Sequence, residues 1–174
     1  MPTKRPAADE FAPYYARYID RVPTGHVVDF LRSHAQTFGA LLAQIPRDRE
    51  TYAYAPGKWT IRELLLHVID TERVMSYRAL SIGRGDATPL PGFDENVWAP
   101  ESGANARSLI DLTAEFAAVR GATIALLNGL PAVAWSRRGT ASNNPVSTRG
   151  LAYIIAGHAI HHEGILRERY LGAS

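Results

Sequence analysis

Apolar residues recur at every third or fourth position in four long segments of the chain, which is the spacing of the buried face of an α-helix. The segments cover residues 24–45, 60–82, 105–128 and 147–170. The second segment has the clearest start, because Thr60-Ile61-Arg62-Glu63 fits a capping box. Four helices of this length predict an all-α fold, a four-helix bundle with a long crossover between the second and third helices.

Two irregular segments accompany these helices. Residues 1–23 form a proline-punctuated N-terminal arm whose aromatic set includes Tyr14, Tyr15 and Tyr18. We expect this arm to pack across the bundle, although its tyrosines could equally line the mouth of a pocket. Residues 83–104 form a long loop without regular structure, which is either a lid over a pocket or a packed crossover. No boundary divides the chain, so we treat residues 1–174 as a single domain.

The composition excludes several classes of protein. The 174 residues carry a net charge of +2 and no basic tract with interleaved aromatics, so nucleic acid is not expected as a partner. There is no cysteine, which excludes disulfides, cysteine-based zinc sites and a cysteine nucleophile. No segment approaches the roughly 20 apolar residues of a membrane span, and the basic N-terminus has no apolar run behind it. We therefore expect a cytoplasmic protein without membrane association.

Two histidines in the last predicted helix are the first candidates for chemistry. His158 and His162 are four residues apart, which stacks their imidazoles on the helix face that also carries Ile154 and Ile155. Buried histidines need polar partners, and this pair either binds a metal ion or forms hydrogen bonds with backbone or water in the core. His161 points about 100° away from His162 on a regular helix, so we do not count it as a ligand.

A third candidate, His67, lies two turns into the second predicted helix and beside its apolar stripe. Asp70 and Glu63 flank it at helical spacing, and they are either acceptors that orient its ring or ordinary surface charges. We expect His34 to be a satisfied core or boundary histidine and His26 to be solvated. His67 is therefore the histidine most suited to join the pair in the last helix.

Together, His67, His158 and His162 can meet at one point between two facing helices of a bundle. Three neutral imidazoles leave one coordination position open, which is the arrangement of a catalytic rather than a structural zinc. Such a site lowers the pKa of a bound water from about 15.7 toward 7, or it binds and deprotonates a substrate thiol. We predict a divalent metal ion as the cofactor, with Zn²⁺, Ni²⁺ and Fe²⁺ all compatible.

At these residues the sequence resembles the DinB-like superfamily, the DinB/YfiT-type metal-binding four-helix-bundle proteins of bacteria. The resemblance rests on Lys58-Trp59-Thr60-Ile61-Arg62-Glu63-Leu64 followed by His67, on Pro89-Leu90-Pro91-Gly92-Phe93-Asp94-Glu95-Asn96, on Gly157-His158 with His162, and on the arm Tyr14-Tyr15-Ala16-Arg17-Tyr18-Ile19. These motifs extend over nearly the whole chain. The resemblance implies that His67, His158 and His162 are the metal ligands and that the protein is a homodimer.

The resemblance also implies an activity. Members of the superfamily transfer low-molecular-weight thiols such as bacillithiol or mycothiol, or use a thiol to isomerise a substrate, so we expect an S-transferase acting on small electrophilic substrates. One alternative is a hydrolase using metal-bound hydroxide, with Asp94, Glu95 or Asp70 as general acid or base. Another is a non-catalytic metal-binding or damage-responsive module. The candidate substrate-binding residues are Asp94, Asn96 and Tyr18.

Overall fold

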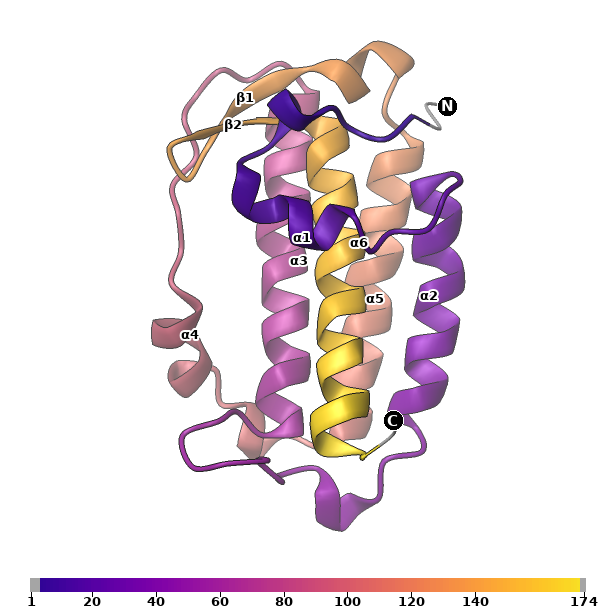
Figure 1. Ribbon diagram of the computed structural model, residues 1–174, viewed down its shortest axis with the longest axis vertical. Helices are drawn as coiled ribbons and strands as arrows, with labels where there is room; N and C mark the ends of the chain where they lie inside the picture. Colours follow the sequence, from indigo (N-terminus) through magenta and orange to yellow (C-terminus); the bar gives the residue numbers. More distant parts are fainter. Residues whose placement is uncertain (1–3, 173–174) are drawn as a thin grey trace.

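Four long helices form the body of the protein in the computed structural model, which describes residues 4–172 (Figure 1). They are α2 (Val27–Leu42), α3 (Ile61–Gly83), α5 (Leu109–Asn128) and α6 (Thr148–Ile165), and α6 continues as a π-helical turn over Leu166–Tyr170. The predicted all-α four-helix bundle is therefore confirmed. A small two-stranded sheet is added at one end of the bundle.

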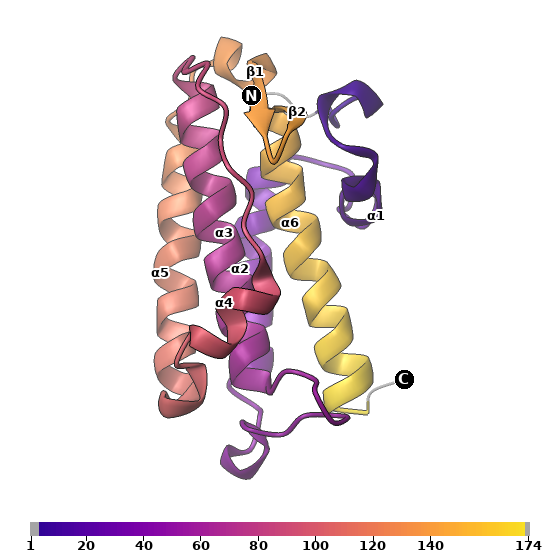
Figure 2. The ribbon, with the colours of Figure 1, turned by 90° about the vertical axis from the view of Figure 1, so that its left-hand side faces the viewer.

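The order of the helices around the bundle requires a long crossover. Helix α3 packs against α6 and α5, and α2 packs against the same two helices. The chain leaves the end of α3 and returns along the length of the bundle before α5 begins (Figure 1 and Figure 2), so that α3 and α5 run parallel. Helix α6 runs antiparallel to α3. This arrangement brings the first half of α3 alongside the second half of α6.

The helix boundaries follow from local sequence. The Thr60 hydroxyl accepts a hydrogen bond from the Glu63 backbone N–H, and the Glu63 carboxylate accepts one from the Thr60 N–H, so the predicted capping box is formed. The Ser147 hydroxyl caps α6 by accepting a hydrogen bond from the Gly150 N–H. Helix α2 begins later than residue 24, because Gly25 has a φ of 129°, which lies outside the helical region.

A β-hairpin precedes α6 and covers the end of the bundle where α6 begins (Figure 1). Its strands β1 (Arg138–Ala141) and β2 (Asn144–Ser147) pair antiparallel. The two turn residues, Ser142 and Asn143, have φ angles of 51° and 61°. Positive φ at both central residues is the requirement of a type I′ turn, whose twist suits a two-residue hairpin loop.

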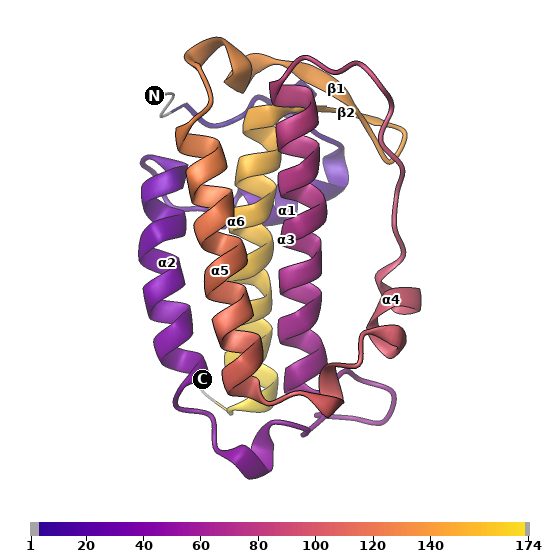
Figure 3. The same cartoon turned by 180° about the vertical axis from the view of Figure 1, so that it is seen from behind.

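The crossover after α3 is more regular than the loop predicted for residues 83–104. It contains α4 (Glu95–Glu101), and the Asp94 carboxylate caps this helix by accepting a hydrogen bond from the Asn96 N–H at 2.9 Å. Figure 3 shows α4 on the outer side of α3. Leu90 forms two backbone hydrogen bonds with the hairpin. The prediction of an irregular segment is thus wrong for α4, because a helix of 7 residues is too short to reveal hydrophobic periodicity.

The described part of the N-terminal arm, residues 4–23, lies across α6 (Figure 1). Its short helix α1 (Ala16–Ile19) packs against α6 and buries Tyr18. Nearer the start of the chain, the buried Glu10 carboxylate accepts a hydrogen bond from the Ser147 hydroxyl at 2.7 Å. The arm is therefore fixed to α6 at two heights along the helix.

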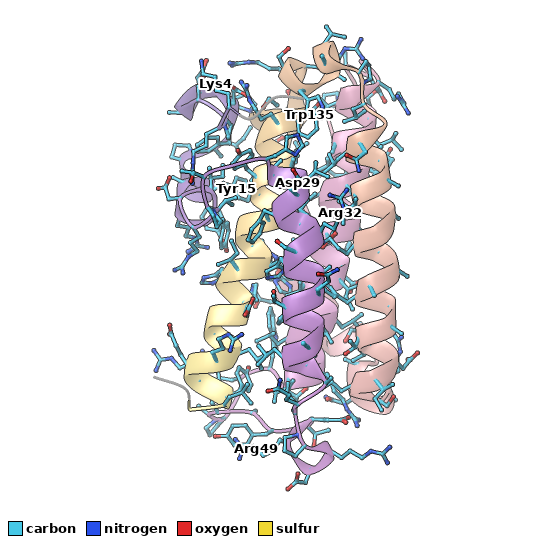
Figure 4. The ribbon with its side chains drawn as sticks, turned by 90° about the vertical axis from the view of Figure 1, so that its right-hand side faces the viewer. Lys4, Tyr15, Asp29, Arg32, Arg49 and Trp135 are labelled. Atoms are coloured by element: carbon cyan, nitrogen blue, oxygen red, sulfur yellow. The ribbon has the colours of Figure 1, made fainter. Side chains whose placement is uncertain are left out.

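Apolar side chains from all four long helices fill the interior, and Trp135 is one of the largest fully enclosed residues. Figure 4 shows Trp135 near the end of the bundle where α2 begins, with Arg49 at the opposite end. Within residues 4–172, no helix is both long enough and apolar enough to cross a membrane.

Candidate metal centre

The antiparallel pair α3 and α6 brings three histidines together in the middle of the bundle. His67 is two turns into α3, and His158 and His162 are one turn apart on α6. The Nε2 atoms of His67 and His158 lie 3.0 Å apart, and the potential ligand nitrogens of the three rings all lie within 4.8 Å of one another. His161 is not a member of this cluster in the part of the chain that the structure describes. The structure thus assembles the three histidines that the sequence analysis selected as ligands.

Burial keeps all three imidazoles neutral. His158 and His162 are 7% and 8% exposed. Loss of solvation lowers the pKa of His67 to about 4 and that of His162 to about 2. Burial, with the neighbouring His162 and His67, also lowers the pKa of His158 well below 6.5. A neutral imidazole has one unprotonated nitrogen, which is the form that binds a metal ion.

The geometry of the cluster fits a metal ion. Bonds of about 2.0–2.1 Å allow two nitrogens on one zinc ion to stand at most about 4.2 Å apart. The 3.0 Å pair satisfies this limit, and the separations of the three rings, all within 4.8 Å, exceed it by less than 1 Å at most. The Nδ1 atom of His162 is buried without a hydrogen-bond partner among residues 4–172, which is costly unless an ion or ligand engages the ring. Three nitrogen donors suit Zn²⁺, Ni²⁺ or Fe²⁺.

A cavity of about 220 Å³ opens in front of the cluster. Its walls come from the arm, α3, α6, the crossover and the hairpin turn. The Trp59 ring lies 4.7 Å from the His67 ring, and the Tyr18 ring lies 5.5 Å from the His158 ring, measured between centroids. These two aromatic side chains pack on the histidine rings beside the cavity, which gives a ligand access to the cluster.

The arm supplies the charged and aromatic edge of this cavity. Tyr18 is 6% exposed, and its hydroxyl accepts a hydrogen bond from the Arg17 guanidinium at 2.9 Å. The same guanidinium lies over the Tyr14 ring, 3.9 Å from its centroid. Burial and the adjacent Tyr14 raise the pKa of Tyr18 to about 12, so its hydroxyl stays protonated at neutral pH. Tyr18 thus lines the pocket, as its candidate role requires, and Arg17 adds a fixed positive charge.

The carboxylates considered in the sequence analysis have different positions. Glu95 lines the cavity. Asp94 and Asn96 are exposed at the start of α4, where Asp94 serves as the helix cap, so neither side chain is among the residues that line the cavity. The Glu63 carboxylate accepts from the Thr60 N–H and from the Asn105 amide, not from His67.

Asp70, the other carboxylate near His67, is partly buried on α3, with 29% of its side chain exposed. It accepts a hydrogen bond from Arg73 at 3.3 Å. Burial raises the pKa of Asp70, while the Arg73 hydrogen bond opposes that effect. Asp70 and Glu63 therefore fit the surface-charge alternative better than the role of orienting the His67 ring.

A further buried histidine, outside the cluster, links it to the rest of the bundle. His34 on α2 lies between Arg120 on α5 and Glu163, the residue after the ligand His162. Because Arg120 can only donate, Nδ1 of His34 accepts its hydrogen bond at 3.3 Å and the Nε2–H donates to Glu163 at 3.0 Å. Arg120 also forms a paired hydrogen bond with Glu72 on α3. His34 is thus a satisfied core histidine, as predicted.

His26 differs from its predicted environment. Its side chain is 17% exposed, and both ring nitrogens are buried without a hydrogen-bond partner in residues 4–172. The centroid of its ring lies 6.5 Å from that of Trp135, a contact between distant parts of the chain that no local pattern predicts. Arg17 and Thr71, which both line the cavity, were not predicted as site residues. Thr71 follows His67 by four residues on α3, so helical spacing could have identified it.

Comparison with known proteins identifies one family for this chain. The sequence profile of the DinB superfamily matches residues 29–166. No curated protein matches the chain. Among solved structures, YfiT from Bacillus subtilis, described as a probable metal-dependent hydrolase with an unusual four-helix bundle topology, is 16% identical, with a TM-score of 0.67 over 98% of this chain and 95% of that one.

Two further structures share the fold. A DinB-like protein of Bacillus subtilis, YjoA, is 21% identical, with a TM-score of 0.60 over 85% of this chain and 92% of its own. The mycothiol-dependent maleylpyruvate isomerase is 14% identical, with a TM-score of 0.68 over 89% of this chain and 63% of its own. Identities this low establish the fold alone, but the profile match extends over most of the sequence and confirms the family predicted from its motifs. This chain belongs to the DinB superfamily.

Proposed function

We propose that the protein is a divalent-metal-dependent enzyme that activates a low-molecular-weight thiol for transfer to a small electrophilic substrate. The observation that carries the proposal is the cluster of three neutral histidines, with ligand nitrogens within 4.8 Å of one another, at the wall of a 220 Å³ cavity. When bound there, a divalent ion would stabilise a coordinated thiolate near neutral pH. His67, His158 and His162 would hold the ion.

The residues of this chain have separate tasks in that proposal. Trp59 and Tyr18 exclude water from the histidines on either side of the cavity. The Arg17 guanidinium provides a positive potential at the cavity edge, which favours an anionic sulfur over a neutral one. The chain contains no cysteine, so the nucleophilic sulfur comes from a cosubstrate. The thiolate attacks an electrophilic carbon of the substrate. The new carbon–sulfur bond forms as the bond from that carbon to its leaving group breaks, the leaving group departs with the electron pair, and the thiol proton passes to solvent.

The cavity also limits the cosubstrate. Its volume of about 220 Å³ lies below the roughly 300–1,000 Å³ of pockets that enclose drug-sized ligands. A bacillithiol- or mycothiol-type molecule would therefore place only its thiol-bearing end inside, with the remainder at the open edge beside Tyr14 and Arg17. The proposal also includes Zn²⁺, Ni²⁺ or Fe²⁺ as the native metal, which elemental analysis tests. It includes a homodimer as well, which sedimentation tests.

Conjugation of a thiol to monochlorobimane by the metal-loaded protein tests the proposal directly. His158→Ala should lower the rate more than tenfold, because the site loses one of its three ligands. The matched control is His26→Ala, which removes a partly buried histidine that packs on Trp135, outside the residues lining the cavity. Equal rates for wild type and His158→Ala would contradict the proposal.

A metal-dependent hydrolase is the second candidate, and one observation favours it. Glu95 is the carboxylate among the residues that line the cavity, so it is placed to act as a general acid or base toward an attacking water. Metal-dependent cleavage of esters or amides that is lost in Glu95→Gln, combined with no thiol conjugation, would favour this reaction. Thiol conjugation that survives Glu95→Gln would argue for the transferase.

A further inference from the structure

The buried hydroxyl of Thr71 differs from the hydroxyls of the threonines inside α5. Within a helix, a threonine hydroxyl usually donates to the backbone carbonyl one turn earlier. Thr113 and Thr123 on α5 do so, bonding the carbonyls of Leu109 at 2.7 Å and Val119 at 3.0 Å. The Thr71 hydroxyl is buried, in a residue only 4% exposed, and has no hydrogen-bond partner among residues 4–172.

The location of the Thr71 hydroxyl separates it from that of Thr148 at the start of α6, which is also buried without a partner among residues 4–172 but does not line the cavity. Thr71 lines the metal-centre cavity, one helical turn after His67 on α3. Among residues 4–172, the other residue that lines this cavity and has an unpaired buried polar atom is His162. A buried hydroxyl without a partner is unfavourable, so a ligand in the cavity that forms a hydrogen bond with Thr71 satisfies a group that the protein alone leaves unpaired.

The neighbouring residues define the shape of such a ligand. His67, Thr71 and Met75 follow one another at intervals of four along α3, and all three line the cavity. Ile154, one turn before His158 on α6, lines the same end as Met75. Moving away from the histidines, a ligand therefore meets a hydroxyl about 6 Å along the helix axis and then an apolar surface.

We propose that Thr71 is a substrate-positioning residue that selects thiols carrying a polar group one helical turn from the sulfur. The assignment rests on the proposed thiol-dependent function. The sulfur lies at His67, His158 and His162, the Thr71 hydroxyl bonds an amide or carboxylate oxygen of the same molecule, and the apolar remainder contacts Met75. No bond is made or broken at Thr71. Its effect is to fix the orientation of the thiol for attack.

A pair of small thiols separates this role from general packing. N-acetylcysteamine carries an amide two carbons from its sulfur, whereas pentanethiol has a similar length and no polar group. Binding is followed by the absorption change of the cobalt-loaded protein. Thr71→Val should weaken N-acetylcysteamine about threefold to tenfold, the range for one neutral hydrogen bond, and leave pentanethiol unchanged. Thr71→Ser should keep the wild-type preference.

Thr123→Val is the control, since it removes a buried threonine hydroxyl that already has a backbone partner and lies on α5. It should leave the binding of both thiols unchanged. Equal losses for the two thiols in Thr71→Val, or no loss for either, would overturn the role of Thr71. If neither thiol alters the spectrum of the wild-type protein, the thiol-dependent function fails, and the positioning role fails with it.

Thermal unfolding without ligand provides a second readout. Because valine has the shape of threonine and removes the unpaired hydroxyl, Thr71→Val should unfold at the same temperature as wild type or at a higher one. Thr123→Val should unfold at a lower temperature, since its hydroxyl is bonded at 3.0 Å. A lower unfolding temperature for Thr71→Val would mean that the hydroxyl has a structural partner, which overturns the proposal.

Discussion

The backbone of Tyr18 lies directly on Gly157 of α6. A Cβ atom at position 157 would stand 2.0 Å from the Tyr18 carbonyl oxygen and 2.3 Å from its carbonyl carbon. Only glycine allows this approach, and Gly157 immediately precedes the candidate ligand His158. The contact explains how the arm comes close enough to α6 for the Tyr18 ring to cover the His158 ring.

Substitution of this glycine should detach the arm. In Gly157→Ala the added methyl group meets backbone atoms that cannot rotate away, so we expect a loss of about 1–3 kcal/mol in the free energy of unfolding. Gly164→Ala on the same helix is the control, because no heavy atom lies within 4 Å of its added Cβ. It should gain about 0.5–1 kcal/mol from helix propensity. Urea unfolding measures both, and equal stabilities would contradict the contact.

The sequence contained enough information for the bundle and for the histidine cluster. Helical periodicity located all four long helices, and the Thr60–Glu63 capping box fixed the start of α3. The position of that start determines which face of α3 each following residue occupies, and so places His67 toward the interior of the bundle. The close approach of Tyr18 to Gly157 could not be predicted, because it depends on how a short, irregular arm folds back over a helix more than 130 residues away in sequence.

The polar network in the core was also beyond sequence analysis. Glu72, Arg120, His34 and Glu163 come from four different helices, and their hydrogen bonds join residues 48, 86 and 129 positions apart. No local spacing distinguishes them from surface charges. The crossover helix α4 was missed for a related reason, because its cap at Asp94 was interpreted as a pocket contact and its length is too short for periodicity.

The buried ion pair in that network should be essential for stability. Arg120 and Glu72 are 0% and 3% exposed, and they form two hydrogen bonds at 2.7 and 2.8 Å. Glu72→Gln leaves the Arg120 charge uncompensated in the core, so we expect a loss of about 3–5 kcal/mol in the free energy of unfolding. The exposed pair between Asp9 and Arg138 is the control, since Asp9→Asn should cost at most about 1 kcal/mol. Similar losses in the two variants would show that the buried pair is not the stronger one.

The metal-free protein should lose stability as the pH falls from 7 to 5. His67 and His162 have folded-state pKa values of about 4 and about 2, below the ordinary value of 6.5. Between these values the unfolded chain binds protons that the folded chain does not, so acid favours unfolding. Each such histidine contributes a slope of up to about 1.4 kcal/mol per pH unit.

Chemical denaturation of chelator-treated protein at several pH values measures this slope. The range ends at pH 5 because carboxylates with lowered pKa values, among them Glu10 and Glu50, add a further acid-dependent loss below 4.5. The double variant His158→Gln, His162→Gln should show a shallower slope than wild type. An identical slope would mean that these imidazoles are not held neutral by the fold.

The most direct test of the account is the metal content of the purified, untagged protein, measured by elemental mass spectrometry. We expect about one divalent ion per chain in the wild type and in His161→Ala, since the His161 ring packs 5.0 Å from His162 but lies outside the three-histidine cluster. The double variant His158→Ala, His162→Ala should contain none. A wild-type protein that stays metal-free after incubation with zinc, nickel and iron, or a double variant that retains its ion, would contradict a metal centre formed by His67, His158 and His162.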